Sequence, residues 1–354
     1  MIAPKPYLLA AMLILIGGAI YLISLYSIPR TGPNEPVTVA PRTSGKSQIY
    51  ELAKEITTPD GFINTNGKSI TINELIGKKV ILIDFWTYSC INCQRTTPYL
   101  NAWYEKYKDK GLVIIGIHTP EFEFEKDYNN VKAAVEKFGI AFPVVLDNDY
   151  STWTAYKNRY WPRKYLIDID GYIVYDHIGE GAYEETEKEI QEALSERMTI
   201  LGEGGAINQS ITKETPSYSG AKSPETYFGA FRNQLLGNGA QGVVGNQRGL
   251  TIPQEPKLNT LYLAGDWNIA NEFAENKTGQ AKIIFRYEAK SVYFVAGSEN
   301  DVKIKIIKDG EIVGEQNVHS HKLYNLIEDS ELGNHTLEII IENPGLRAYT
   351  FTFG

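Results

Sequence analysis

The chain has 354 residues, of which 43% are hydrophobic and 22% charged, so its composition is that of a globular protein rather than a disordered one. Its length suggests about two domains. The formal net charge is -8 and no stripe of Lys and Arg stands out, which excludes nucleic acid as an expected partner.

Residues 7–27 carry no charge and are numerous enough to cross a bilayer as a helix. This apolar run is longer than the core of a cleaved signal peptide, and no small-residue cleavage site follows it, so we expect an uncleaved anchor over residues 1–28. One basic residue precedes the run and three follow it (Lys5, then Arg30, Arg42 and Lys46), which by the positive-inside rule slightly opposes an extracytoplasmic body. We nevertheless expect a single-pass cell-membrane protein with its catalytic part extracytoplasmic, because of the chemistry described below.

Residues 29–48 are rich in Pro, Thr, Gly and Ser and are predicted to be a linker. From 49 to 200, apolar runs alternate with segments of helical spacing, which indicates an α/β layered domain. The expected elements are a hairpin over 62–72 around Asn66-Gly67, strands at 80–83, 113–117 and 144–146, helices after Cys93, over 131–138 and over 183–198, and a hairpin of 165–169 with 172–176 around Asp170-Gly171.

Residues 201–224 are rich in Gly, Ser, Thr and Pro and are predicted to be a second linker. Helical spacing is almost absent beyond it, which predicts an all-β sandwich, jelly-roll-like, over residues 225–354. The expected strands are 258–264, 282–287, 292–295, 302–307, 338–341 and 349–353, with a turn at Asp309-Gly310. Three aromatic residues there, Tyr262, Trp267 and Tyr293, either stack on a sugar ring or fill the core of the sandwich.

The chain contains only two cysteines, Cys90 and Cys93. A pair this close in sequence closes a tiny loop and stabilises little, so its purpose is sought in reactivity. Cys90 falls between a predicted buried strand and a predicted helix, where free amides and the helix macrodipole stabilise a thiolate nucleophile. Cys93 lies one turn later and can resolve a mixed disulfide. Asp84 lies on the apolar strand, where burial raises the pKa of a carboxyl group and suits it to exchange a proton with Cys93.

Residues 84–93, together with Pro98 in the first turns of the helix, resemble the active-site strand and helix of thioredoxins. The inserted segment 129–146 is similar to that of the membrane-tethered TlpA and ResA branch. The runs FWTYSCINCQRTTPYLNAWYEKY, GIHTPEFEFEK and NRYWPRKYLIDIDG closely resemble the extracytoplasmic region of DipZ-type proteins. The resemblance is strong over residues 50–198 and looser over the C-terminal region. The pair between the cysteines, Ile91-Asn92, departs from the Gly-Pro and Pro-His pairs of relatives.

This resemblance implies that Pro162 is a cis-proline facing the cysteine pair, and that a substrate polypeptide adds as a strand along the neighbouring backbone. Tyr160 and Trp161 would line that groove. The C-terminal region is similar to carbohydrate-binding modules, which makes a glycan its candidate ligand. DipZ-type chains also carry a multi-helix electron-transfer domain, so here a membrane thiol-electron donor would act in trans. The expected function is reduction of protein disulfides, with the cysteine pair as redox group and no other cofactor.

Two other functions share these motifs. Thr87-x-x-Cys90 resembles the motif of peroxiredoxin-like thiol peroxidases, although Ile83 stands where that family has a proline. A cell-wall or glycan-binding module with a non-catalytic cysteine pair is the second alternative. A zinc site is not expected, because no second cysteine pair is present and His118 and His177 could complete one only by coincidence.

Several residues near the cysteines are assigned to the substrate groove or its surroundings. Trp86 is expected to pack in the core near the site. Glu121, Glu123 and Glu125 alternate with Phe122 and Phe124, a pattern typical of a solvated edge, but Glu121 follows a predicted parallel strand and is a candidate for tuning the thiol. The assigned set is Trp86, Tyr88, Glu121, Tyr160 and Trp161.

Overall fold

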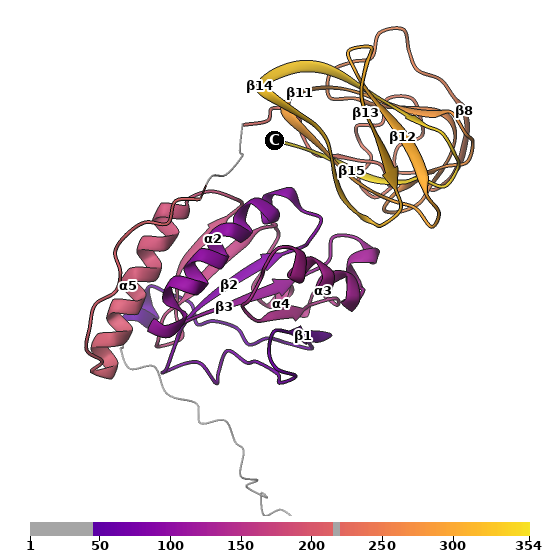
Figure 1. Cartoon of the computed structure of the whole chain (residues 1–354). Helices are drawn as coiled ribbons and strands as arrows, with labels where there is room; N and C mark the ends of the chain where they lie inside the picture. The colour runs from indigo at the N-terminus through magenta and orange to yellow at the C-terminus, as the bar shows by residue number, and fades with distance from the viewer. Residues whose placement is uncertain (1–44, 215–219) are drawn as a thin grey trace, which may run out of the picture. The chain divides into compact units, whose positions relative to one another are not determined.

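Residues 45–214 and 220–354 are described by the computed structural model of the chain. They form an α/β region over residues 49–201, called here the redox domain, and an all-β domain over residues 220–354 (Figure 1). The predicted anchor, and all but the last residues of the predicted linker 29–48, lie outside the described residues. No helix among the described residues is long and apolar enough to cross a bilayer.

The redox domain is built on a six-stranded sheet with the order β1-β4-β3-β2-β5-β6. The central strands β2, β3 and β4 run parallel, while β1, β5 and β6 are antiparallel to their neighbours. The strands are β1 (Gly61–Ile63), β2 (Val80–Trp86), β3 (Leu112–His118), β4 (Val144–Leu146), β5 (Arg163–Ile167) and β6 (Ile173–Ile178). The helices are α2 (Ile91–Tyr107), α3 (Tyr128–Lys137), α4 (Ser151–Ala155) and α5 (Tyr183–Leu201), with short 3-10 turns η1 (Lys46–Gln48), η2 (Lys108–Lys110) and η3 (Glu123–Lys126).

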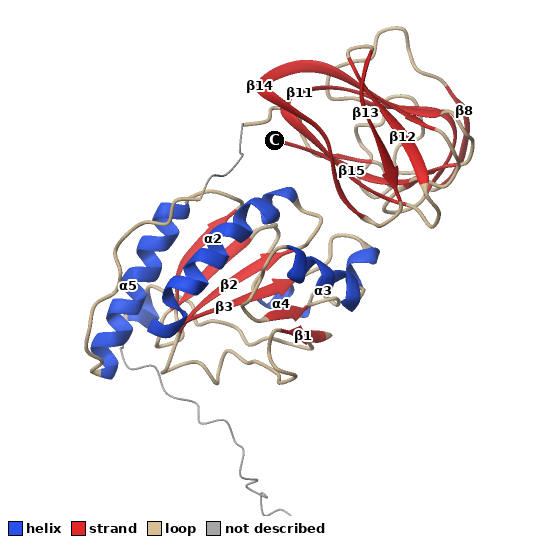
Figure 2. Cartoon of the chain, viewed as in Figure 1, coloured by secondary structure: helices blue, strands red, loops and turns tan. Residues whose placement is uncertain are grey.

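Strand β2 is buried along its whole length, as its apolar run predicted. Because successive side chains of a strand point to opposite faces, Val80 and Leu82 join the core beneath α2 and α5, while Ile81 and Ile83 join the core on the other face. Figure 2 shows α2 and α5 side by side against the sheet. The same alternation places Asp84 on the face covered by α2, which is the face that carries Cys93.

The two predicted hairpins of this domain have different outcomes. The one around Asp170-Gly171 is confirmed, since β5 and β6 pair antiparallel and Gly171 takes a φ of 91°. The one around Asn66-Gly67 is wrong. Asn66 and Gly67 do form a left-handed turn, with φ of 55° and 74°, but no strand follows it, and β1 pairs with β4 instead.

The all-β domain is a single nine-stranded sheet rather than the expected sandwich of two sheets. Strand β11 pairs with β14, β15 and β9, and β9 is joined to β15 through β10, so these strands close a small barrel. The strands are β7 (Thr226–Tyr227), β8 (Gly245–Leu250), β9 (Leu261–Ile269), β10 (Ala274–Asn276), β11 (Ala281–Gly297), β12 (Val302–Lys308), β13 (Glu311–Val318), β14 (Lys322–Ile341) and β15 (Arg347–Phe353). The predicted strands 282–287 and 292–295 are one long strand, β11, whose pairing shifts register between Ala289 and Ser291.

The three aromatic residues considered for sugar stacking are buried. Trp267 lies in the core of the all-β domain, where its indole Nε1 donates to the carbonyl of Ala264. Tyr262 and Tyr293 are also buried, and the guanidinium of Arg95 lies over the ring of Tyr293. None of the three offers an exposed face to a pyranose, so these residues fill the interior and do not form a glycan platform.

The first half of the predicted linker 201–224 is packed against the preceding domain. Helix α5 ends at Leu201, and Ile207 then inserts into the core between α2 and α5. Thr212 donates from its backbone and its hydroxyl to the buried carboxylate of Glu187. Residues 207–212 therefore pack on the redox domain, because an apolar side chain and a buried acceptor hold them there.

Candidate active site

The two cysteines open helix α2. Cys90 is the N-cap residue with extended φ and ψ of -78° and 118°, and its carbonyl accepts the first helical hydrogen bond, from Gln94. Cys90 is partly exposed, whereas Cys93 is buried, with 2% of its surface accessible. Both are thiols in this structure. Burial, and then the neighbouring sulfur of Cys90, raise the pKa of Cys93 well above its usual range, so Cys93 holds its proton until a base removes it.

Asp84 and Lys164 are cross-strand partners on β2 and β5, and both are almost completely buried. Burial raises the pKa of Asp84 to about 7, and the nearby ammonium of Lys164 opposes this shift. Burial likewise lowers the pKa of Lys164, against the attraction of Asp84. Oδ1 of Asp84 makes no hydrogen bond with any described residue, so it remains able to accept a proton. Asp84 is among the groups that raise the pKa of Cys93, which places its charge near that sulfur.

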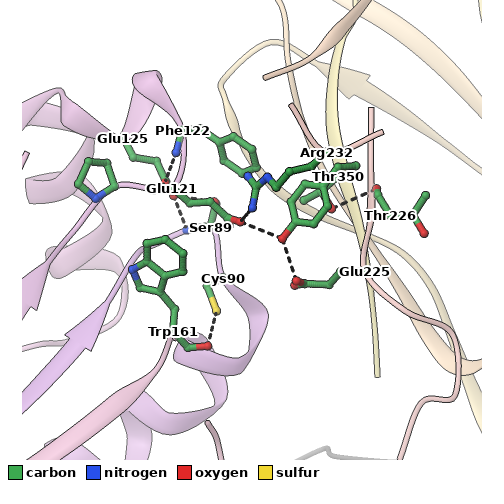
Figure 3. Close-up of polar contacts among 12 residues, drawn as sticks. Ser89, Cys90, Glu121, Phe122, Glu125, Trp161, Glu225, Thr226, Arg232 and Thr350 are labelled. Atoms are coloured by element: carbon green, nitrogen blue, oxygen red, sulfur yellow. Dashed lines mark hydrogen bonds and ion pairs between the residues drawn. The ribbon is translucent and has the colours of Figure 1, made fainter. Parts of the chain in front are cut away.

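The segment predicted to line the substrate groove, residues 160–162, lies beside Cys90. The peptide bond between Trp161 and Pro162 is cis, as the family resemblance implied. The Cys90 Sγ lies 4.0 Å from the carbonyl oxygen of Trp161. Figure 3 shows the sulfur pointing toward this oxygen. The indole of Trp161 is fixed by a hydrogen bond from Nε1 to the carbonyl of Thr119 and by packing on Trp153. Tyr160, also assigned to this groove, is 49% exposed.

Glu125 supports the loop that precedes Cys90 from behind. Its side chain is completely buried, and its Oε1 accepts hydrogen bonds from the hydroxyl (2.6 Å) and the backbone N–H (3.2 Å) of Ser89. Its Oε2 accepts from the backbone N–H groups of Glu121 and Phe122. Burial raises the pKa of Glu125 to about 7 despite these donors. The carboxyl group thus ties the active-site loop to the segment 120–126.

Trp86, Tyr88 and His118 pack together beneath the site. The ring of Tyr88 stacks on that of His118, and Trp86 meets His118 edge-on. His118 Nε2 lies 3.4 Å from the hydroxyl of Thr87. Burial lowers the pKa of His118 to about 3, so the ring is neutral at ordinary pH and serves as packing rather than as an acid or base.

Glu121 lies near the cysteines in sequence but its side chain is engaged elsewhere. Its Oε1 accepts from Nη1 of Arg232 at 2.6 Å and from the hydroxyl of Tyr227 at 2.9 Å, both on the all-β domain (Figure 3). Next to it, Phe122 is buried against Tyr349 of the same domain. Glu121 thus joins the two domains, and its role in tuning the thiol stays a prediction.

Comparison with known proteins agrees with this geometry. Residues 51–194 match the family model described as Redoxin, and residues 223–354 match the model described as Thioredoxin like C-terminal domain. The chain is 37% identical to the thiol-disulfide oxidoreductase ResA of Bacillus thuringiensis over 40% of this chain and 76% of that protein. It is 31% identical to the thiol-disulfide oxidoreductase YkuV of Bacillus subtilis over 37% of this chain and 87% of that protein.

The chain belongs to the thioredoxin-like thiol–disulfide oxidoreductases. This oxidoreductase is also 37% identical to the protein DipZ of Mycobacterium tuberculosis over 311 residues, which are 84% of this chain. It spans 43% of the length of that relative.

Two residues of the oxidoreductase's site were not identified by sequence reasoning. Lys164 carries a basic side chain on a strand whose next residues are apolar, and only the pairing of β2 with β5 brings it opposite Asp84. Glu125 was included in an alternating pattern typical of a solvated edge, but the segment forms the 3-10 turn η3 and directs this side chain inward. A signal for Lys164 was present, since a lone lysine in a predicted buried strand calls for a partner charge.

Proposed function

We propose that this oxidoreductase reduces disulfides of polypeptide substrates on the extracytoplasmic side of a membrane, to which residues 1–28 anchor it. The observation that carries the proposal is the difference between the two thiols. Cys90 is accessible at the N-terminus of α2, facing the carbonyl of Trp161, while Cys93 is buried one turn behind it. An accessible thiol suits attack on a substrate, and a buried one suits resolution.

In the proposed reaction, the thiolate of Cys90 attacks one sulfur of the substrate disulfide. The substrate S–S bond breaks, a mixed disulfide forms, and the leaving sulfur departs as a thiolate that takes up a proton. Cys93 then gives its proton to the carboxylate of Asp84 and attacks the sulfur of Cys90. The second substrate sulfur leaves as a thiolate, which takes up a proton from Asp84 or from water. The substrate has gained two electrons and two protons, and the enzyme holds a Cys90–Cys93 disulfide. A membrane dithiol donor acting in trans returns the pair to the reduced state by the same exchange.

The backbone beside Trp161 and Pro162 supports a polypeptide as the substrate. Carbonyl and amide groups beside a strand end can pair with an extended chain, as in other cases of strand addition. The exposed ring of Tyr160 and the partly exposed ring of Trp161 give that chain apolar surface next to the reactive sulfur. The apolar composition of residues 7–27 supports the membrane anchor.

A trapping experiment tests the assignment of the two cysteines. In a Cys93→Ser variant the mixed disulfide cannot be resolved, so non-reducing gels of the purified full chain incubated with an oxidised protein substrate should show a covalent adduct. The matched Cys90→Ser variant should form none. Adducts on Cys93 in the Cys90→Ser chain, or rapid consumption of hydrogen peroxide with no disulfide reduction, would overturn the proposal in favour of other thiol chemistry.

The location is tested with the same Cys93→Ser chain, because Cys90 is then its single cysteine. A membrane-impermeant maleimide applied to intact cells should label Cys90 to the extent that it does after lysis. Labelling that requires lysis would place the redox domain on the cytoplasmic side and contradict this part of the proposal.

A further inference from the structure

A cavity of about 320 Å³ lies between the redox domain and the all-β domain, beside the active site. The described residues of both domains belong to one compact unit, and both contribute to its walls. The lining residues used below are Glu121, Tyr150, Trp161, Phe231, Arg232 and Glu272.

The cavity is adjacent to the reactive sulfur. The indole of Trp161 forms part of its wall, and the carbonyl of the same residue faces the Cys90 Sγ at 4.0 Å. We expect a polypeptide whose disulfide reaches Cys90 to run close to the cavity, because Trp161 borders both. Because residues of an extended chain are about 3.3 Å apart, a side chain within a few positions of the substrate cysteine can enter it.

The charges around the cavity favour a cation. Arg232 is the one residue with a guanidinium or ammonium group among those that line the cavity. Its guanidinium already pairs with the Glu121 carboxylate at 2.6 Å and lies 3.7 Å from the ring centroid of Tyr227. Glu272 also lines the cavity, and its one described hydrogen bond to the redox domain is from the backbone N–H of Glu123. Among the lining residues, two carboxylates face one guanidinium, so one carboxylate has no lining cation to pair with.

The surroundings of the Tyr150 hydroxyl show the same excess of negative charge. Burial, and then the carboxylates of Glu125, Glu121 and Glu272, raise its pKa to about 12, and the guanidinium of Arg232 opposes them. The negative charges therefore prevail at this wall, as they do for a site that attracts cations.

The apolar walls suit the long stem of a basic side chain. Phe231 is 67% exposed although it is a large hydrophobic residue, and the ring of Trp161 faces the same space. Lysine and arginine bury their methylene stems on apolar surface and place the charged head near a carboxylate or over an aromatic face. This combination of exposed rings and an unneutralised carboxylate matches such a side chain better than an acidic or a purely apolar one.

We propose that this cavity binds a lysine or arginine side chain of the substrate polypeptide close to the disulfide being reduced, so that the all-β domain takes part in substrate selection. The inference rests on the proposed function, since it requires a polypeptide disulfide at Cys90. It assigns Glu272 as the residue that determines the preference.

The test compares disulfide-linked peptides that differ only in charge. Peptides carry Lys, Gln or Glu at each of the three positions on either side of the cysteine, and kcat/KM is measured for their reduction by the reduced full chain. The wild-type chain should prefer the best Lys peptide to its Glu counterpart by about tenfold, and this ratio should fall with added salt. Glu272→Gln should lower the ratio several-fold, and Glu272→Lys should reverse it.

A matched control is Glu311→Gln, which removes an exposed carboxylate from β13 outside the cavity and should keep the wild-type ratio. The ratio of kcat/KM for the Lys and Glu peptides is measured on the same variant, so a partial loss of folded protein lowers both values equally and leaves the ratio unchanged. Equal rates for Lys and Glu peptides, or the same ratio in Glu272→Gln as in the wild type, overturn the inference. Reduction of neutral hydroxyethyl disulfide distinguishes failure of the cavity inference from failure of the proposed function. If the wild type reduces this compound but shows no charge preference, only the cavity inference fails. If the wild type does not reduce it, the proposed function fails as well.

Discussion

Glu121 of the redox domain and Arg232 of the all-β domain form an ion pair in which Oε1 and Nη1 are 2.6 Å apart. The Glu121 side chain is 11% exposed and that of Arg232 39%. The pair adjoins the buried contact of Phe122 with Tyr349, so charge and apolar packing hold the same segment, residues 120–126, against the second domain. Because the Glu121 carboxylate is largely removed from water, this pair should contribute more than an ordinary surface pair.

A double-mutant cycle with Glu121→Gln and Arg232→Met measures that contribution. We expect a coupling free energy of about 1–2 kcal/mol, reduced from the value of a fully buried pair because Arg232 remains partly in solvent. Denaturant unfolding of the four chains provides the measurement. The exposed pair Glu184 and Lys188 on α5 is the matched control and should show a clearly smaller coupling. Equal couplings in the two cycles would show that the interdomain pair is no more than a surface contact.

Replacing Asp84 with asparagine should stabilise the reduced protein at alkaline pH. A carboxyl group whose pKa is 3.8 when unfolded and about 7 when folded binds its proton more tightly in the folded state. Its cost to folding therefore appears as the pH rises from about 4 to 7 and is complete above pH 7. Since one pKa unit corresponds to about 1.4 kcal/mol, the gain in Asp84→Asn at pH 8 has a ceiling of roughly 4 kcal/mol, lowered by the loss of a partner for Lys164.

Unfolding by guanidinium at pH 8 and at pH 5, with both cysteines reduced, checks this expectation. The difference between Asp84→Asn and wild type should shrink at the lower pH. The variant should also release the second substrate thiol more slowly, because Cys93 then lacks its proton acceptor. A variant no more stable than wild type at pH 8 would argue against a buried, proton-binding Asp84.

Removing the charge of Lys164 should shift the pH dependence of resolution upward. The Lys164 ammonium lowers the pKa of Asp84, so in Lys164→Met that pKa rises further above its ordinary range and less carboxylate is present at neutral pH. Single-turnover release of the second substrate thiol should be slower at pH 7 and should recover at higher pH. Lys157→Met, at an exposed lysine of the same domain, is the control. An unchanged midpoint in the pH profile of Lys164→Met would exclude electrostatic coupling between Lys164 and Asp84.

Replacing Glu125 with glutamine should loosen the loop in front of Cys90. The carboxylate accepts four hydrogen bonds from three residues, and glutamine offers a single acceptor oxygen, so at least two buried donors lose their partner. We expect the lost hydrogen bonds to cost about 2 kcal/mol at pH 5, against about 1 kcal/mol for Ser89→Ala, which removes only one hydroxyl donor. The loss in Glu125→Gln should be smaller at pH 8, because burial raises the pKa of Glu125 to about 7 and the ionised carboxylate carries a burial cost that glutamine does not. Thermal unfolding measures both. Equal losses would mean that the backbone donors find other acceptors.

Much of the redox domain could be predicted from sequence because its signals are local. The apolar run of β2, the helical spacing of α2 and the Asp170-Gly171 turn each form an element close to the expected one. The hairpin at Asn66-Gly67 failed because a turn signal does not say which strand its neighbour will pair with, and β1 finds β4 about 80 residues further along the chain.

Non-local features account for the rest. The functional surroundings of the cysteines depend on pairings and domain contacts that spacing cannot reveal: Lys164 meets Asp84 through the β2–β5 register, and Glu121 meets Arg232 across domains. In the all-β domain, individual strands were recognised, but the closure of β11 on β9 depends on contacts among strands far apart in the chain. The aromatic residues considered for sugar binding could not be distinguished from core residues without knowing that closure.

The segment 120–126 has a practical consequence for work on the isolated redox domain. Its Phe122 and Phe124 rest on Tyr349, while its Glu125 holds Ser89 beside the nucleophile. A chain shortened to end before residue 220 would bare two aromatic rings to water at the same segment that positions the reactive loop. Rates measured on such a fragment would describe an enzyme whose loop before Cys90 is less firmly held. Low solubility of the fragment would result from the exposed rings of Phe122 and Phe124 and not from misfolding of the redox domain.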